Sequence, residues 1–156
     1  IKSFSHLEGA IISDEVVIGP YARLRPESEI DKGAKIGNFV EIKKAKIGEG
    51  AKVNHLSYVG DANVGQNVNI GAGTITCNYD GFAKHLTVIG NDVFIGSNTS
   101  LVAPVEVGDN AIIGAGSTIT KSVDENALSV VRGELKEIPN GAKRFRSRRQ
   151  QDRKKD

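Results

Sequence analysis

An aliphatic residue returns at every sixth position along most of this chain. Seventeen such units follow one another, with two slips of one position and one longer interruption after residue 70: Ile12, Ile18, Leu24, Ile30, Ile36, Ile42, Ile47, Val53, Val59, Val64, Ile70, Ile89, Ile95, Leu101, Val107, Ile113 and Ile119. Gly directly follows ten of these residues, and a small or β-branched residue usually stands four positions after them. A helix has a period of about 3.6 residues and an alternating strand a period of about 2, so neither explains a fixed period of six. We interpret each hexad as a short strand followed by a corner.

Three hexads close a triangular coil, and such coils stack as parallel strands about 4.8 Å apart. The seventeen units correspond to nearly six coils, with the aliphatic and small residues pointing inward. We therefore predict an all-β chain: a parallel β-helix over residues 1–132, a protruding loop at residues 76–87 and an extended or disordered basic tail at residues 133–156. The period alone does not fix the hand of the coil. Residues 1–9 resemble part of a coil, so we expect further chain upstream.

Composition agrees with this fold and limits the classes of partner. The chain of 156 residues has 18 Gly, 5% aromatic residues and neither Trp nor Met, so its core must be filled by small aliphatic side chains. The lone Cys77 excludes an internal disulfide and fits a reducing, cytoplasmic setting. No apolar run reaches about 18 residues, so membrane insertion is not expected. Residues 143–156 carry a net charge of +6 and residues 1–142 of −4, so no basic face continues the tail and nucleic-acid binding is not expected.

The candidate for proton transfer is His55, which lies two positions after Val53 at a predicted corner, with its ring outward. A His in such a place is more often a solvated surface residue, although its titration near neutral pH suits it to catalysis. Glu41 lies about one coil earlier, and we expect it to hydrogen-bond the imidazole and fix its tautomer. His6 and His85 are isolated in the sequence, and three such His match no metal-ligand spacing, so no metal site is expected.

Cations occupy predicted corners near His55. Arg25, Lys43 and Lys44 would belong to an ordinary solvated face on most proteins, but their clustering favours an anionic ligand such as a phosphate. The sequence Gly71-Ala72-Gly73 allows either simple turn formation or close approach of backbone N–H groups to an oxyanion. Its recurrence at Gly114-Ala115-Gly116 favours the structural interpretation. Cys77 has no adjacent His, so it is interpreted as a buried or loop thiol.

Three longer motifs carry a more specific signal: G-N-F-V-E-I-K-K (37–44), N-H-L-S-Y-V-G-D (54–61) and N-I-G-A-G-T-I-T-C-N-Y-D-G (69–81). With the hexads, they make the chain resemble the hexapeptide-repeat acyltransferases, and among these the bacterial bifunctional members. The resemblance covers roughly residues 11–132. It implies a left-handed β-helix, a homotrimer with active sites between subunits, and acetyl transfer from acetyl-CoA to the 2-amino group of glucosamine 1-phosphate. That reaction serves the synthesis of UDP-N-acetylglucosamine for peptidoglycan and lipopolysaccharide precursors.

The same resemblance assigns roles to individual residues. His55 is implied to be the general base, and no metal is implied for this reaction. The acceptor-side positions are Arg25 and Lys43 for the phosphate, Tyr58 and Asn69 for the sugar, and Lys84 for the phosphate of a neighbouring subunit's site. The positions implied for acetyl-CoA are Ala72, Asn78, Tyr79, Ser97, Ala115 and Arg132. The chain shows no Gly-rich nucleotide-binding segment, so the uridyltransferase domain of the bifunctional members is expected to be absent from it.

Two other interpretations compete with this one. A hexapeptide-repeat acyltransferase for a different amino or hydroxy substrate would keep the fold, but a substrate without phosphate would not need Arg25 and Lys43. A non-catalytic solenoid that binds through a flat face would show regular Thr arrays, whereas the corner positions here mix Lys, Asp, Asn and Glu.

Overall fold

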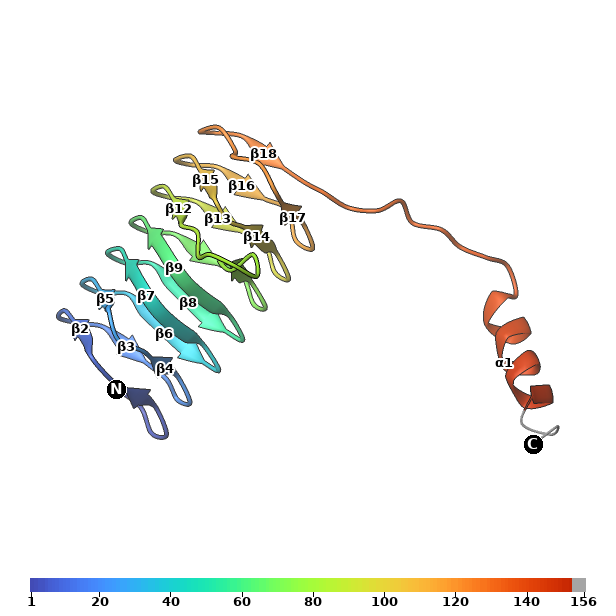
Figure 1. Cartoon of the computed structure of the whole chain (residues 1–156), viewed down its shortest axis with the longest axis horizontal. Helices are drawn as coiled ribbons and strands as arrows, with labels where there is room; N and C mark the ends of the chain where they lie inside the picture. The colour runs from blue at the N-terminus through green and yellow to red at the C-terminus, as the bar shows by residue number, and fades with distance from the viewer. Residues whose placement is uncertain (153–156) are drawn as a thin grey trace.

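Short parallel strands stacked along one axis make up most of the computed structural model, which describes residues 1–152 (Figure 1). They form three faces. The first face contains seven strands: β1 (His6–Leu7), β4 (Arg23–Leu24), the first half of β7 (Glu41–Ile47), the first half of β9 (Tyr58–Val64), β11 (Ile75–Cys77), β14 (Ser100–Val102) and β17 (Thr118–Ile119).

The second face is a separate seven-stranded sheet. Its strands are β3 (Val17–Ile18), β6 (Lys35–Asn38), β8 (Lys52–His55), β10 (Asn69–Ile70), β13 (Phe94–Ile95), β16 (Ile112–Ile113) and β18 (Leu128–Ser129). The third face contains β2 (Ala10–Ile12), β5 (Ser28–Ile30), the second halves of β7 and β9, β12 (Thr87–Ile89) and β15 (Val105–Val107). The parallel β-helix is therefore confirmed. It has about seven coils instead of nearly six, because short strands at both ends, β1 and β18, lie outside the hexads.

The core is a column of the side chains that the hexads placed inward. Of the seventeen aliphatic residues, sixteen are buried, and the remaining one, Ile12, packs partly buried against them. The small residues at the second inward position are buried as well, among them Ala34, Ala51 and Ala111. Because each coil repeats the same two inward positions, the core runs without interruption along the axis and holds the corners rigidly in register.

Two corners matter for the site. The first, which we call the His55 corner, joins the second face to the first face and carries two columns of residues. The outer column contains Asn38, His55, Ala72, Ser97 and Ala115. The next column contains Phe39, Leu56, Gly73, Asn98 and Gly116. Backbone hydrogen bonds join the two columns from coil to coil, such as Gly73 N to His55 O (3.3 Å) and Asn98 N to Ala72 O (2.8 Å). Buried hydroxyls brace this corner from inside: Ser57 donates to the carbonyl of His55 (2.8 Å) and Thr74 to that of Gly71 (2.8 Å).

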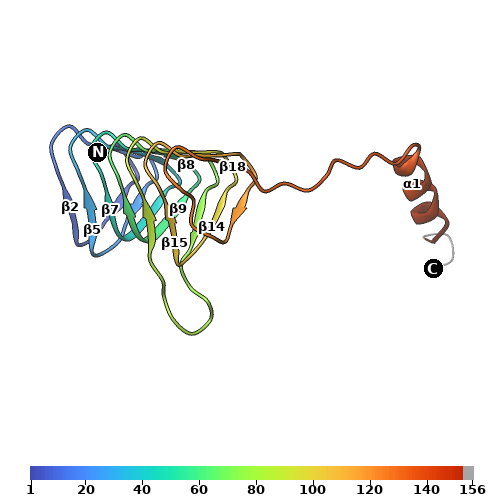
Figure 2. The same cartoon turned by 90° about the horizontal axis from the view of Figure 1, so that it is seen from above.

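The second, which we call the loop corner, joins the first face to the third face. Strands β7 and β9 bend around it at Lys44 and Asp61, whose φ angles are 46° and 47°. In the next coil the chain leaves this corner after Cys77 and returns at Thr87. Figure 2 shows the intervening loop standing out from the solenoid, as the break in the hexads predicted.

The tail after β18 differs in part from the prediction. Residues 130–138 have no regular secondary structure and lead away from the last coil, but the helix α1 (Gly141–Asp152) follows them (Figure 1). This helix forms because residues 142–152 contain neither Gly nor Pro and are rich in Arg, Lys and Gln, which favour helices. The charges predicted for Arg153, Lys154, Lys155 and Asp156 lie outside the described residues. The division of the chain at residue 132 stays a prediction.

Candidate active site

His55 ends β8 at the His55 corner, and its exposed side chain has a side-chain partner one coil below. Asn38 ends β6 in register with it, and Nδ1 of His55 lies 2.7 Å from Oδ1 of Asn38. An amide oxygen only accepts hydrogen bonds, so this contact favours the neutral tautomer with the proton on Nδ1, in which the lone pair of Nε2 is free. The outward ring predicted for His55 is present, and this is the tautomer that a general base at Nε2 needs.

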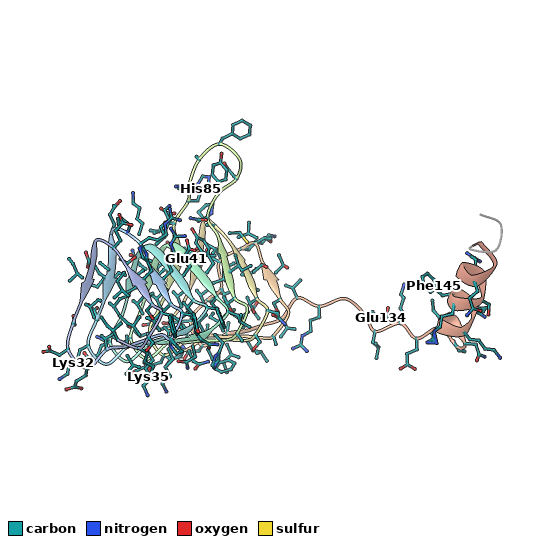
Figure 3. The ribbon with its side chains drawn as sticks, turned by 90° about the horizontal axis from the view of Figure 1, so that it is seen from below. Lys32, Lys35, Glu41, His85, Glu134 and Phe145 are labelled. Atoms are coloured by element: carbon teal, nitrogen blue, oxygen red, sulfur yellow. The ribbon has the colours of Figure 1, made fainter. Side chains whose placement is uncertain are left out.

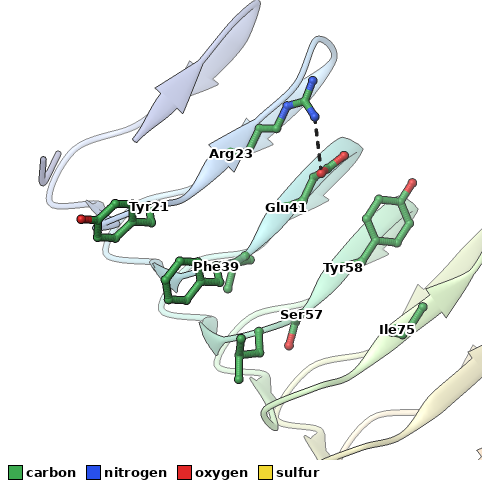
Figure 4. Close-up of a pocket in the computed structure, with 9 residues that line it drawn as sticks. Tyr21, Arg23, Phe39, Glu41, Ser57, Tyr58 and Ile75 are labelled. Atoms are coloured by element: carbon green, nitrogen blue, oxygen red, sulfur yellow. Dashed lines mark ion pairs between the residues drawn. The ribbon is translucent and has the colours of Figure 1, made fainter. Parts of the chain in front are cut away.

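The partner predicted for this ring is wrong. Glu41 belongs to β7 on the first face, where its Oε1 accepts from Nη1 of Arg25 at 3.0 Å and its Oε2 lies 3.7 Å from Nη1 of Arg23. Figure 4 shows the Arg23–Glu41 pair, and Figure 3 shows Glu41 on the side of the solenoid from which the loop with His85 projects. The register explains the difference: Glu41 pairs with Arg23 across the ladder, while Asn38 pairs with His55.

Polar residues gather where the first face meets the loop corner. Nζ of Lys43 lies 3.3 Å from Oδ2 of Asp61, and Nδ2 of Asn78 donates to the same carboxylate oxygen. The amide of Asn78 is also 3.4 Å from the hydroxyl of Tyr58. The structure therefore brings together Lys43, predicted for the phosphate, Tyr58, predicted for the sugar, and Asn78, predicted for acetyl-CoA.

The side chains of Lys43 and Lys84 lie close enough to shift each other's pKa, although the two residues are far apart in sequence. The presence of Lys84, the largest cause, and of the Asp61 carboxylate raises the pKa of Lys43, whereas the neighbouring Lys43 lowers the pKa of Lys84. With both amines protonated, the single carboxylate of Asp61 leaves the cluster with an excess positive charge. An anion such as a phosphate is the ligand that such an excess favours.

The loop that carries Lys84 is a small hairpin held together by its own polar groups. Tyr79 and Lys84 form an antiparallel bridge, and the N–H of His85 donates to the carbonyl of Asn78 (2.8 Å). At its tip, Oδ1 of Asp80 accepts from the N–H groups of Phe82 and Ala83, and Oδ2 lies 2.7 Å from Nε2 of His85. These hydrogen bonds hold the pKa of the Asp80 carboxyl well below its usual range. The predicted acetyl-CoA residue Tyr79 is exposed at this loop's base, where its hydroxyl donates to the carbonyl of Gly81 (2.7 Å).

The three remaining small residues predicted for acetyl-CoA stand in one line with His55. Ala72, Ser97 and Ala115 occupy the same column of the His55 corner in the coils above it, so no large side chain projects there. A Cβ atom added to Gly71 would lie only 2.5 Å from the backbone nitrogen of Ser97. The corner is therefore packed backbone against backbone. Arg132 closes this line, because its guanidinium lies directly over Gly114.

In the coil of His55 and in the coils below it, the same corner carries large apolar side chains instead of small residues. Phe4, Tyr21, Phe39 and Leu56 are exposed in successive coils and adopt left-handed φ angles of 61°, 57°, 54° and 51°. The three aromatic rings stack, with centroids 5.0 Å apart for Phe4 and Tyr21 and 5.4 Å apart for Tyr21 and Phe39. We call these four residues the apolar ladder. It borders a groove of about 430 Å³ on the first face that also contains Arg23, Glu41 and Tyr58 (Figure 4).

Asn69 is the predicted substrate residue that the chain does not bring to this cluster. It begins β10 on the second face, half-buried between Lys52 and Phe94 of the neighbouring strands, whereas Arg25, Lys43, Tyr58 and Lys84 lie on the first face and its loop. Two residues that the sequence did not single out, Asn38 and Asp61, prove to hold His55 and Lys43. Asn38 was detectable, because it precedes His55 by the 17 residues of one coil.

Within residues 1–152, no three His, Cys, Asp or Glu side chains are grouped as metal ligands. Over the same residues, no helix combines the length and the apolar character needed to cross a membrane.

Comparison with known proteins identifies the repeat and the relatives of the chain. Residues 9–44 and 86–121 match the family described as bacterial transferase hexapeptide (six repeats). The chain is 62% identical over 138 residues to the bifunctional protein GlmU of Marinobacter nauticus, a match that covers 88% of this chain and 30% of that protein. It is 60% identical over 149 residues to the bifunctional protein GlmU of Zymomonas mobilis, which covers 96% of this chain and 33% of the relative. The chain thus spans about a third of the length of these curated relatives.

Solved structures share the fold at much lower sequence identity. A perosamine N-acetyltransferase from Caulobacter crescentus, in complex with CoA and GDP-perosamine, superposes with a TM-score of 0.65 at 19% identity, over 76% of this chain and 58% of that one. A maltose O-acetyltransferase from Clostridium difficile 630 gives a TM-score of 0.51 at 20% identity, over 80% of this chain and 71% of the other. The chain therefore contains bacterial transferase hexapeptide repeats and is similar, at about 60% identity, to about a third of the length of bifunctional GlmU proteins.

Proposed function

We propose that this chain transfers the acetyl group of acetyl-CoA to the 2-amino group of glucosamine 1-phosphate, yielding N-acetylglucosamine 1-phosphate for UDP-N-acetylglucosamine synthesis. The observation that carries the proposal is the position of His55. A ring with a free Nε2 stands where the apolar ladder ends and the small-residue column begins, so an acceptor on one side and a donor on the other would meet at this nitrogen. The identity of about 60% to GlmU proteins supports the choice of substrates.

The proposed chemistry needs one proton acceptor and two well-placed substrates. Nε2 of His55 takes a proton from the amino group as its nitrogen attacks the thioester carbonyl. The tetrahedral intermediate collapses, the C–S bond breaks, and the CoA thiolate receives the proton held by the imidazolium. No redox step is involved.

The acceptor is proposed to be held by its phosphate. Lys43 supplies a positive charge, and Arg25, already oriented by Glu41, supplies a planar donor, while Lys84 is proposed to reach the phosphate of a neighbouring copy's site. Tyr58 and Asn69 are proposed to contact the sugar. Fixing the phosphate places the amine before attack, which reduces the entropy lost in the transition state.

The donor is proposed to lie along the small-residue column. Ala72, Ser97 and Ala115 leave space for an extended pantetheine arm, and Arg132 lies at the end of this column near Gly114. Asn78 and Tyr79 of the loop are proposed to contact the donor as well. Arg132 is suited to a phosphate of CoA, since a guanidinium can bind phosphate through two parallel hydrogen bonds.

We further propose that three copies of the chain form the active sites between them. Asn69 on the second face lies apart from the cations on the first face, so one chain does not surround an acceptor by itself. The exposed apolar ladder offers a surface that a neighbouring copy would cover. Size-exclusion chromatography with light scattering tests this point, and a monomeric but fully active chain would contradict it.

A thiol-release assay tests the activity. The chain is incubated with acetyl-CoA and glucosamine 1-phosphate, and released CoA is measured against the background of Cys77. We expect turnover with the native chain and its loss in His55→Ala with the assembly unchanged. Equal turnover with unphosphorylated glucosamine would instead support an acyltransferase for another amino or hydroxy substrate. Failure to release CoA with any acceptor would favour a non-catalytic solenoid.

A further inference from the structure

Asp61 is an unusual residue for its position. It lies in β9 at the loop corner, only 8% exposed, with a φ of 47°. Asp adopts left-handed backbone more readily than most residues, but burying its carboxylate costs free energy unless it is paired. A carboxylate that bears this cost at a corner is expected to be held there for a reason.

The equivalent position one coil below shows what this corner normally tolerates. Lys44 occupies it in β7 with a φ of 46° and forms an exposed ion pair with Glu27, at 3.6 Å, near solvent. Both of these side chains are more than half exposed, whereas the side chain of Asp61 is 11% exposed and that of its partner Lys43 is 17% exposed. The Asp61–Lys43 pair is therefore mostly buried, whereas the Lys44–Glu27 pair at the same corner is solvated.

A single oxygen of Asp61 connects two parts of the site. Oδ2 is 3.3 Å from Nζ of Lys43, which we assign to the acceptor side, and it also accepts from Nδ2 of Asn78, the residue where the loop begins. The loop is closed on itself by the bond from His85 N to Asn78 O (2.8 Å), so fixing Asn78 fixes its base. Lys84 then returns from that loop to lie beside Lys43.

Charge explains why the link is needed. Two ammonium groups at close range repel each other, and without a carboxylate Lys84 would push Lys43 away or lose its proton. Asp61 supplies one negative charge to this pair and leaves room for a second from the ligand. Its neutral isostere would leave the two lysines unbalanced until the ligand arrives.

We propose that Asp61 is a positioning residue: it holds the Lys43 ammonium in place for a bound phosphate and ties the base of the loop that carries Lys84 to β9. This inference rests on the proposed function for the identity of the ligand, but not for the link between the loop and β9. Asp61 acts through Lys43 and Asn78 and does not itself contact the phosphate.

The substitution Asp61→Asn separates charge from shape, because Asn tolerates left-handed backbone and its amide oxygen still accepts from Asn78. We expect the KM for glucosamine 1-phosphate to rise about tenfold or more, since a buried lysine loses its counter-charge, while the KM for acetyl-CoA changes by less than about twofold. Glu27→Gln is the matched control, as it removes the exposed pair of the same corner, and it should leave both constants unchanged.

A double substitution distinguishes positioning from a general loss of structure. In a Lys43→Met background, Asp61→Asn should add little to the KM for glucosamine 1-phosphate, because the residue through which it acts is gone. Equal effects in the native and Lys43→Met backgrounds, or an Asp61→Asn enzyme with native KM, would overturn the proposal.

Hydrogen exchange of the chain without ligands tests the loop link without any activity. Asp61→Ala, which removes both contacts, should accelerate exchange of the loop amides in residues 78–86 while the strands of the second face stay protected. Loop exchange equal to that of Glu27→Gln would contradict the link. If the native chain released no CoA at all, the proposed function would fail, and this exchange measurement would still decide the role of Asp61 at the loop.

Discussion

Nδ1 of His55 lies 2.7 Å from Oδ1 of Asn38, the residue directly below it in the preceding coil. Two corner residues of adjacent coils thus share one hydrogen bond, and this bond selects the ring nitrogen that remains free. The parallel stacking of coils produces the contact without any loop or domain movement. The orientation of the proposed base is therefore a property of the solenoid itself.

Replacing Asn38 tests this relationship. In Asn38→Ala the ring can rotate and take either tautomer, so we expect kcat to fall about tenfold with both KM values near native. This is less than the roughly 10²- to 10⁴-fold loss expected when a general base is removed. Steady-state kinetics measure the effect, with Asn63→Ala as control, since Asn63 is exposed on the third face. A native kcat would show that Asn38 does not orient His55.

Removing the Lys43 charge should affect phosphorylated acceptors selectively. We expect Lys43→Met to raise the KM for glucosamine 1-phosphate about 10- to 100-fold, equivalent to about 1.4–2.8 kcal/mol, because a charge-assisted contact to phosphate is lost. Activity on unphosphorylated glucosamine should not change. Lys46→Met provides the control, as Lys46 forms an exposed pair with Asp31 at 3.9 Å on the third face. An equal loss with both acceptors would contradict the phosphate assignment.

Filling the small-residue column should impair donor binding alone. In Ala115→Leu the new side chain would project into the line above His55, so the KM for acetyl-CoA is expected to rise about tenfold while that for the acceptor stays constant. Thr120→Leu adds a similar side chain at an exposed position after β17 and should have no effect. Weakened acceptor binding in Ala115→Leu would place the donor elsewhere.

The apolar ladder predicts how the chains assemble. Phe39→Asn removes an exposed ring and places at φ 54° a residue that tolerates left-handed backbone, so the free energy of unfolding of a single chain should change little. Association should weaken, because the ring would be covered by a neighbouring copy. Light scattering over a dilution series measures this. Glu15→Asn relieves a φ of 61° at a different corner, where no apolar side chain is lost, and should leave assembly unchanged.

The loop should keep its shape in mildly acidic solution. Hydrogen bonds from Ala83, His85 and Phe82 lower the pKa of Asp80 from its ordinary value of 3.8, so the ionised carboxylate stabilises the loop fully above that value. The stabilisation is lost only as the pH falls well below it. Exchange of the loop amides, corrected for its intrinsic pH dependence, should therefore be equal at about pH 7 and pH 5. Asp80→Asn should accelerate it several-fold at either pH, and unchanged protection would show that Asp80 does not hold the loop.

The hexad pattern was sufficient to predict the core, because the burial of Ile36 or Leu101 depends only on phase within a coil. Contacts between coils were harder to predict, since they depend on the length of each coil. The prediction that Glu41 binds His55 used only an approximate coil length. The actual offset of 17 residues places Asn38 beside His55 and leaves Glu41 on another face with Arg25.

Other features depend on non-local geometry that no local pattern encodes. Asp61 meets Asn78 and Lys43 only because a loop leaves the same corner one coil later. Tyr21 and Phe39 adopt left-handed backbone, which is uncommon for aromatic residues. The stacking of their rings therefore could not be predicted from residue type. The helix α1 differs from the predicted tail because a run of like charges indicates disorder, although the same Arg, Lys and Gln residues also favour a helix.

Along the His55 corner, large apolar side chains end at Leu56, and in the coils above the outer column carries only the small residues Ala72, Ser97 and Ala115. The corner therefore has two different halves that meet at His55, one beside each proposed substrate. Adding or deleting a whole turn beyond Ser97 would lengthen or shorten the grip on a carrier molecule by about 4.8 Å and leave the opposite end untouched. A scaffold of this kind allows donor and acceptor preferences to change independently of each other.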